Sequence, residues 1–219
     1  MNLWVKICGN TSLEDALLAA DAGADALGFV FAPSPRHVTT EQVAAITPHL
    51  PAEIEKIGVF VYSDFHTIAS AVEVAGLTGV QLHSAGGSGL PEQLRQRFGP
   101  ALRILRVIHF GDQAAAQLQA VSGDQHINGV LVDSRTATAV GGTGIPFDWK
   151  AARSSVFTND SGIKLIAAGG LNPGNVAEAI ATLQPWGVDV VSGVEASPGR
   201  KDAAKVRDFI EKARASAAL

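Results

Sequence analysis

Two side chains, the thiol of Cys8 and the carboxyl of Asp133, have the chemistry of a base and an acid that could act on one substrate. Each directly follows an apolar, strand-like segment, Leu3–Ile7 and Val130–Val132. A thiol must be partly ionised to accept a proton, which a nearby cation or helix amino terminus favours. A carboxyl must be protonated to act as an acid, which an apolar setting favours. We therefore predict a catalytic pair; the alternatives are a buried apolar thiol and an aspartate that caps a turn.

Arginine and histidine side chains accompany this pair. Arg36 ends the proline-stiffened loop Pro33–Arg36, and a guanidinium held in such a loop suits a carboxylate. The alternative is an ordinary surface charge. His83 ends another strand-like segment, so we expect it to shape the site or bind substrate. His83, His109 and Asp133 could suggest zinc, but the sequence offers neither a second carboxylate nor paired-histidine spacing, so no metal is predicted.

Glycine-rich turns follow the last three strand-like segments. Backbone N–H groups in such turns can approach an anion closely, and phosphate sites in barrels often lie after strands seven and eight. We therefore predict a phosphorylated substrate, with tight turns of no further role as the alternative. The predicted phosphate-binding residues are Gly142, Gly144, Gly169, Gly170, Ser192 and Gly193.

Eight apolar segments at fairly regular intervals have the composition of buried parallel strands. They are Leu3–Ile7, Ala26–Phe31, Lys56–Val61, Gly79–Leu82, Arg103–Ile108, Gly129–Val132, Lys164–Ala168 and Val188–Val191. Helical patterns follow nearly all of them, and the unit after the sixth segment is the weakest. Thr11–Glu14 and Thr39–Gln42 have capping-box spacing, and Asn172–Pro173 is a helix-start signal, so helices are predicted to begin there.

Eight strand–helix units of about 27 residues predict an α/β protein with a (β/α)8 TIM barrel. The alternative is an open doubly wound sheet, but neither a Gly-x-Gly-x-x-Gly nor a Walker motif follows any segment. The sequence shows no linker, so residues 1–219 are predicted to form a single domain. Because the carboxyl ends of barrel strands share one mouth, Cys8 and Asp133 are expected to face each other there.

The composition disfavours several classes of protein. Charged residues make up 17% of the chain and the net charge is −4, so no basic excess is present for nucleic acid. One cysteine cannot form an internal disulfide, and neither a signal peptide nor a run of about 20 apolar residues is seen. We therefore predict a cytoplasmic protein without nucleic-acid or membrane partners; a monomer and a homodimer both stay open.

An ordered set of motifs over essentially the whole chain resembles the phosphoribosylanthranilate isomerase family of tryptophan biosynthesis. The matching segments are Lys6–Gly9, Gly28–Phe31, Ser34–Arg36, Gly58–Val61, Gln81–His83, Gly141–Gly144, Phe147–Trp149, Ala168–Pro173, Ser192–Glu195, Pro198–Gly199 and Lys201–Asp202. Each segment alone is weak, but their order is highly specific. Ser84 departs from the pattern, because the family often has glycine there.

The resemblance implies a (β/α)8 barrel that converts N-(5'-phosphoribosyl)anthranilate into 1-(2-carboxyphenylamino)-1-deoxyribulose 5-phosphate by an Amadori rearrangement. It implies no metal or organic cofactor. By the same resemblance Asp133 is the general acid that opens the ribose ring, and Cys8 is the general base that takes the proton from C2 of the imine. Arg36 would face the anthranilate end, and the three glycine-rich turns would surround the phosphate of this phosphorylated aminosugar.

Three other functions stay open at this stage. A related sugar-phosphate isomerase of histidine biosynthesis, or a dual-substrate form, resembles this chemistry but has an aspartate where Cys8 stands. A non-catalytic phosphosugar-binding barrel would need the phosphate loops but not both Cys8 and Asp133. A metal-dependent epimerase is the third alternative.

Overall fold

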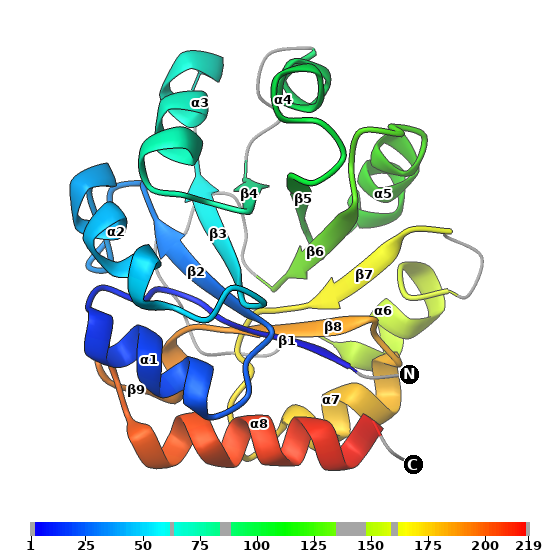
Figure 1. Cartoon of the computed structure of the whole chain (residues 1–219). Coiled ribbons are helices and arrows are strands. Elements are labelled where there is room, and N and C mark those ends of the chain that lie inside the picture. Colours follow the sequence, from blue (N-terminus) through cyan, green and yellow to red (C-terminus); the bar gives the residue numbers. More distant parts are fainter. Residues whose placement is uncertain (1–2, 62–63, 84–88, 135–147, 159–161, 218–219) are drawn as a thin grey trace.

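Eight parallel strands form a closed barrel in the computed structural model, which describes residues 3–61, 64–83, 89–134, 148–158 and 162–217. The strands follow one another in chain order, and β8 pairs with β1 to close the barrel (Figure 1). They are β1 (Trp4–Ile7), β2 (Ala26–Val30), β3 (Glu55–Phe60), β4 (Gly79–Leu82), β5 (Arg103–His109), β6 (Gly129–Asp133), β7 (Lys164–Ala167) and β8 (Gly187–Val190). The barrel prediction is confirmed, and the open doubly wound sheet is wrong because such a sheet has two free edges.

Helices lie around the outside of the barrel (Figure 1). The described α-helices are α1 (Leu13–Asp21), α2 (Thr40–Ile46), α3 (Phe65–Val74), α4 (Leu90–Phe98), α5 (Ala114–Ser122), α6 (Trp149–Ser155), α7 (Val176–Leu183) and α8 (Ala203–Ala217). Two short 3-10 helices, η1 (Thr47–His49) and η2 (Ser192–Val194), accompany them. An antiparallel pair, β9 (Glu195–Ser197) and β10 (Arg200–Lys201), lies between η2 and α8; its strands are too short for a periodicity that the sequence could display.

The three signals for helix starts differ in outcome. Thr39 caps α2, and the capping box with Gln42 is formed. At α1 the helix begins at Leu13 within the predicted segment, but Ser12 rather than Thr11 caps it, because the Thr11 hydroxyl donates to the backbone oxygen of Gly199. The Asn172–Pro173 signal is also wrong, since α7 begins only at Val176. The Asn172 side chain accepts the N–H of Gly174 and so closes a turn ahead of the helix.

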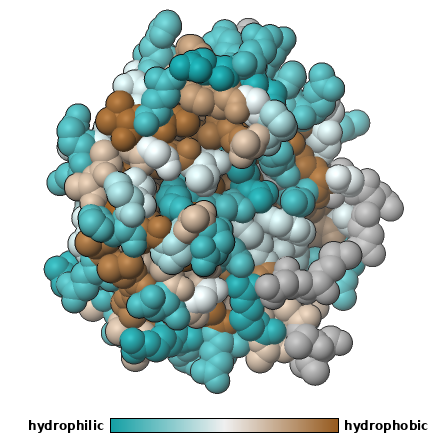
Figure 2. Space-filling model, viewed as in Figure 1, coloured by the Kyte–Doolittle hydropathy of each residue, from teal (hydrophilic) through white to brown (hydrophobic). Residues whose placement is uncertain are grey.

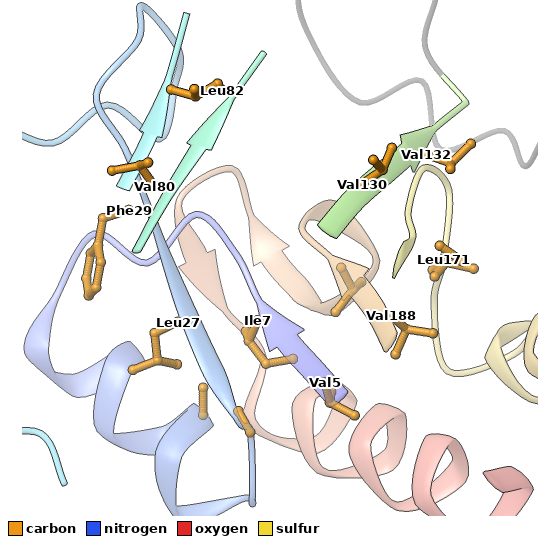
Figure 3. Close-up of a cluster of buried hydrophobic side chains, with 14 of the residues drawn as sticks. Val5, Ile7, Leu27, Phe29, Val80, Leu82, Val130, Val132, Leu171 and Val188 are labelled. Carbon is orange, nitrogen blue, oxygen red and sulfur yellow. The ribbon is translucent and has the colours of Figure 1, made fainter. Parts of the chain in front are cut away.

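Buried side chains form two separate layers. The outer layer packs strands against helices, and Figure 3 shows ten of its members: Val5, Ile7, Leu27, Phe29, Val80, Leu82, Val130, Val132, Leu171 and Val188. The second cluster contains no helix residue and includes Trp4, Ile57, Leu105 and Leu131, so it fills the inside of the barrel. Because side chains alternate along a strand, every second residue of each strand points into the barrel.

Hydrophilic side chains cover much of the face shown in Figure 2, with hydrophobic atoms in several separate areas. Among the described residues, Val74 is the large hydrophobic residue that is exposed. No helix in the described part of the chain combines the length and the apolar character that crossing a bilayer requires. The expectation that residues 1–219 form a single domain stays a prediction.

Candidate functional site

Cys8 and Asp133 lie at the same end of the barrel interior. Cys8 directly follows β1 and lies on the same face as the inward-facing Trp4. Asp133 ends β6 and lies on the same face as the inward-facing Leu131. Both residues are buried, at 3% and 4% exposure. Since all eight strands run parallel, these two strand ends open on one mouth. The structure thus brings the two side chains to the same mouth, as the strand pattern predicted.

The Cys8 thiol lies against Gly28 of β2. A Cβ atom at Gly28 would fall inside van der Waals contact of the Cys8 sulfur, and 3.0 Å from both Cys8 Cβ and Lys6 Cε. Only glycine therefore leaves room for the thiol in its present position. The Cys8 backbone is fixed as well, because its N–H donates to the carbonyl of Val190 at 2.9 Å.

Lys6, two residues before Cys8 on the same face of β1, is fully buried inside the barrel. Its ammonium donates to Gln81 Oε1 of β4 at 2.9 Å and to Asp189 Oδ1 of β8 at 2.8 Å. The sequence pattern alone did not reveal this cluster of Lys6, Gln81 and Asp189. The signal was the spacing of Lys6 and Cys8, which puts both on one face of the strand.

Opposing effects act on the ionisation of the Cys8 thiol. Burial raises its pKa, the positive charges of Lys6 and Lys201 lower it, and the negative charge of Asp189 raises it again, which leaves the pKa above its ordinary value. Burial would lower the pKa of Lys6, but the charges of Asp189 and Cys8 outweigh burial and raise it, so Lys6 is an ammonium ion. The cations Lys6 and Lys201 therefore favour the thiolate form of Cys8.

Arg36 forms a two-pronged ion pair with Glu195. Arg36 Nε donates to Glu195 Oε1 at 2.8 Å and Nη2 donates to Oε2 at 2.7 Å. The stem of Arg36 crosses Gly9, where a Cβ atom would lie 2.9 Å from Arg36 Cδ. Arg36 is therefore a partner of the chain's own carboxylate beside Cys8, and a second carboxylate could meet only the remaining N–H edge of the guanidinium.

Glu195 was not recognised from the sequence as a site residue, although it ends one of the matching motifs. Burial raises the pKa of Glu195. The hydrogen bonds from Arg36 and the charges of Lys201 and Arg36 have the larger, opposite effect, so the pKa lies below its usual value. Lys201 Nζ lies 3.4 Å from Glu195 Oε1 and donates to the backbone oxygen of Cys8 at 2.6 Å. The β9–β10 pair thus links Arg36 to the backbone of Cys8.

The turns after β7 and β8 pack against each other and against Asp133. Gly169 and Gly170 have φ angles of 84° and 69°, which favour glycine. A Cβ atom at Gly169 would lie 2.6 Å from Asp133 Oδ1, and one at Gly193 would overlap the carbonyl of Leu171. These glycines are therefore required by close approach, and they bring both turns to the side of the mouth that holds Asp133.

Backbone N–H groups of these turns have the chemistry to bind an anion. Within the described part of the chain, the N–H groups of Gly169, Gly170, Ser192 and Gly193 have no hydrogen-bond acceptor. Each of these four residues is partly exposed. The other two predicted phosphate-binding residues, Gly142 and Gly144, lie outside the described residues.

His83 follows β4 and is partly exposed at the same end of the barrel. Its Nε2 lies 3.3 Å from Nε2 of Gln81, and its ring centroid lies 6.2 Å from that of His109. His83 thus joins the Lys6 cluster to the rim. Among the residues that the structure describes, no three His, Cys, Asp or Glu side chains are arranged to hold a metal ion.

Comparison with known families finds a match to the family model of N-(5'-phosphoribosyl)anthranilate (PRA) isomerase over residues 5–212. The N-(5'-phosphoribosyl)anthranilate isomerase of Pelobacter propionicus is 43% identical over 211 residues, which cover 96% of this chain and 95% of the relative. The enzyme of the same name from Geobacter sp. strain M21 is 42% identical and is covered to 97%.

Solved structures of similar proteins have the same fold. Phosphoribosyl anthranilate isomerase from Thermotoga maritima is 34% identical with a TM-score of 0.82, and the match covers 97% of this chain and 99% of that one. A phosphoribosyl anthranilate isomerase in complex with reduced 1-(o-carboxyphenylamino)-1-deoxyribulose 5-phosphate is 33% identical with a TM-score of 0.80 and the same coverage. The similarity therefore extends over nearly the full length of both chains.

Proposed function

The chain belongs to the N-(5'-phosphoribosyl)anthranilate isomerase family, and from this premise we propose that Cys8 and Asp133 carry out the reaction as general base and general acid. The activity is the isomerisation of N-(5'-phosphoribosyl)anthranilate in tryptophan biosynthesis. One observation carries the assignment of roles: a buried thiol and a buried carboxyl occupy inward positions on two strands that open on one mouth.

Two proton transfers divide the work between these groups. Asp133 donates a proton to the ribose ring oxygen as the bond from that oxygen to C1 breaks, and the nitrogen lone pair forms the C1–N double bond of the protonated imine. Cys8 then takes the proton from C2. The electron pair left at C2 forms the C1–C2 double bond of the enolamine, and the C1–N double-bond pair returns to nitrogen. Tautomerisation of the enolamine gives the ketone. Cys8 must therefore be a thiolate when C2 reaches it, and it leaves the step as a thiol.

The order of strands around the barrel supports one orientation of the substrate. The elements β6, β7, β8, β1 and β2 are consecutive neighbours, and they lead into Asp133, Gly169–Gly170, Ser192–Gly193, Cys8 and Arg36. The ligand named in the related complex carries a phosphate and a carboxyphenyl group. We assign the phosphate to the N–H groups after β7 and β8, with Gly142 and Gly144 as further predicted contacts.

The anthranilate carboxylate is assigned to the remaining edge of Arg36, which Glu195 holds in place. His83 is assigned to the opposite rim, where it bounds the sugar. This arrangement puts the reacting C1–C2 part of the substrate between Cys8 and Asp133. A monomer or homodimer in the cytoplasm, without nucleic-acid partners, stays a prediction.

An isotope experiment separates the two roles. With substrate that carries deuterium at C2, turnover of Cys8→Ser is expected to show a large primary isotope effect, because proton removal becomes rate-limiting. Turnover of Asp133→Asn is expected to show almost none, because ring opening, which precedes that step, becomes rate-limiting. The reverse pattern would exchange the roles, and near-normal turnover in both variants would overturn the assignment. Loss of substrate fluorescence follows each reaction, and the aminoaldose of histidine biosynthesis tests for a second substrate.

A further inference from the structure

A lysine in the middle of the barrel interior requires a physical reason. Lys6 has no solvent exposure, and it lies in a layer above the apolar residues Trp4, Ile57 and Leu105. Moving an ammonium ion out of water has a free-energy cost that an ion pair often only offsets, and an apolar side chain of similar size would pack there without that cost. Stability alone therefore does not explain why the chain has a charge at this position.

The contacts of the Lys6 ammonium group leave one of its three protons for a further partner. Two of its three protons go to Gln81 Oε1 and Asp189 Oδ1. Its Cε and the Cys8 sulfur converge on the space above Gly28, where a Cβ atom would meet both. The charge on Lys6 thus lies beside the sulfur of Cys8, on the same face of the same strand.

We propose that Lys6 is a positioning residue that makes Cys8 ionisable: held as an ammonium ion by Asp189 and Gln81, it stabilises the Cys8 thiolate inside the buried mouth. The step in which this thiolate takes the C2 proton rests on the proposed function above. The proton goes from C2 to the sulfur, and Lys6 keeps its three protons throughout. Lys6 is not itself the base, because the negative charges of Asp189 and Cys8 raise its pKa in spite of its burial and keep it charged.

Other charged groups face Cys8 from neighbouring elements, and they do not replace Lys6. Lys201 of β10 is engaged by the Cys8 backbone oxygen and by Glu195 of β9. Arg36, from the loop after β2, is paired with the same glutamate. Asp189 of β8 contributes negative charge, which opposes the thiolate, and Asp133 of β6 lies buried at the same mouth. Lys6 therefore has the greatest influence on the sulfur among the cations, since its charge lowers the thiol pKa more than the charge of Lys201 does.

The single cysteine makes the test direct, because any thiolate signal comes from Cys8. The thiolate absorbs near 240 nm (in the far ultraviolet), and subtracting the titration of the matching Cys8→Ala protein removes every other contribution. In Lys6→Met, which keeps the length of the side chain but not its charge, the midpoint of this difference titration is expected to rise by about 1–3 pH units. A midpoint that stays or falls would overturn the proposal.

Two matched variants distinguish an electrostatic effect from damage to the fold. Asp189→Asn removes the negative charge that opposes the thiolate, so the Cys8 midpoint is expected to fall, opposite in sign to Lys6→Met. Lys201→Met removes a buried lysine that is bound to the backbone, and its shift is expected to be smaller than that of Lys6→Met. If Lys6→Met does not fold, Lys6→Gln, which also removes the charge, is titrated in its place, and a midpoint that stays or falls in that variant contradicts the proposal.

Turnover assays keep this proposal separate from the assignment of Cys8 as base. If the midpoint shifts as expected but Cys8→Ala retains turnover, Lys6 controls the thiol and the assigned base is wrong. If Cys8→Ala loses turnover and Lys6→Met leaves the midpoint unchanged, Cys8 stands as the base and the role of Lys6 is refuted. When Cys8 is the base and Lys6 controls its ionisation, the alkaline shift in the pH profile of kcat/KM for Lys6→Met is expected to match the shift of its thiol midpoint.

Discussion

Charged side chains are held differently at the two ends of the barrel interior. At the amino end, Arg103 stacks over the rings of Trp4 and Trp186, with 5.9 and 5.5 Å from its guanidinium carbon to the ring centroids. It pairs with Glu55, and both side chains are 23% exposed. At this end the charges reach water while their stems cover aromatic rings, which stabilises the barrel without the full desolvation of an ion.

At the carboxyl end, the charges are enclosed. Lys6 and Asp189 have side chains that are 0% and 6% exposed, and Glu195 with Lys201 is similarly buried. Such groups lose their hydration and offer little net stability, so they are expected where chemistry needs charge at a fixed point. The comparison indicates that the amino end maintains the barrel and the carboxyl end works on substrate. The following variants, from the largest expected effect to the smallest, test that division.

Removal of the two reacting groups should have the largest effect. Cys8→Ala and Asp133→Asn are each expected to lower kcat by about 10²–10⁴-fold, because each takes away a positioned proton-transfer group. Circular dichroism and thermal unfolding are expected to show that both proteins stay folded. Turnover within threefold of the parent protein in either variant would show that the mouth works by another route.

At the opposite end, Trp4→Ala should reduce stability rather than catalysis. Trp4 stacks on Trp186 at 5.3 Å and is 6% exposed, so its truncation is expected to lower the free energy of unfolding by about 3–5 kcal/mol. Denaturant titration measures that loss, and kcat of the folded protein at low temperature is expected to stay unchanged. A tenfold fall in kcat without a loss of stability would contradict the division between the ends.

Arg36→Ala is expected to lower kcat/KM through the loss of charge-assisted hydrogen bonds, worth about 1.5–3 kcal/mol or about 10–150-fold. The change should fall mainly on KM, since Arg36 is assigned to the anthranilate carboxylate and not to a reacting atom. Arg36→Lys is the matched control: it keeps the charge but loses the two-pronged geometry with Glu195, so an intermediate value is expected. An unchanged kcat/KM in Arg36→Ala would remove Arg36 from the site.

Gly28→Ala tests the fit of the thiol. The added methyl group would overlap the Cys8 sulfur, so the thiol must shift, at about 1–3 kcal/mol, and kcat should fall with it. Gly111→Ala is the control, because a Cβ atom there meets nothing within 4 Å. Equal effects of the two substitutions on kcat would mean that the position of the sulfur is not critical.

Glu55→Gln should have the smallest effect. Its ion pair with Arg103 is partly exposed, so the expected loss of stability is below about 1 kcal/mol, and kcat/KM should not change. Thermal unfolding at low and high salt measures this loss of stability, and the difference from the parent protein should shrink as salt rises. A loss as large as that of Trp4→Ala would show that charge, rather than aromatic packing, maintains the amino end.

The sequence by itself was enough to predict the eight strands, the closed barrel and the shared mouth of Cys8 and Asp133. These features depend on local patterns, namely apolar segments of strand length and the alternation of side chains, which are written along the chain. The ordered motifs also carried the family resemblance. Helix starts were less secure, because Thr11 and Asn172 had competing partners for their side chains.

Only the tertiary structure decided which side chains meet inside the mouth. Lys6 contacts Gln81 and Asp189 because β1, β4 and β8 surround one interior, and residues 75 and 183 positions apart in the chain become neighbours. The pairing of Arg36 with Glu195 likewise spans 159 positions. The stagger of the strands in the closed barrel sets these contacts, and no local pattern encodes that stagger. The sequence therefore determined which groups reach the mouth, and the fold decided which charges surround the thiol.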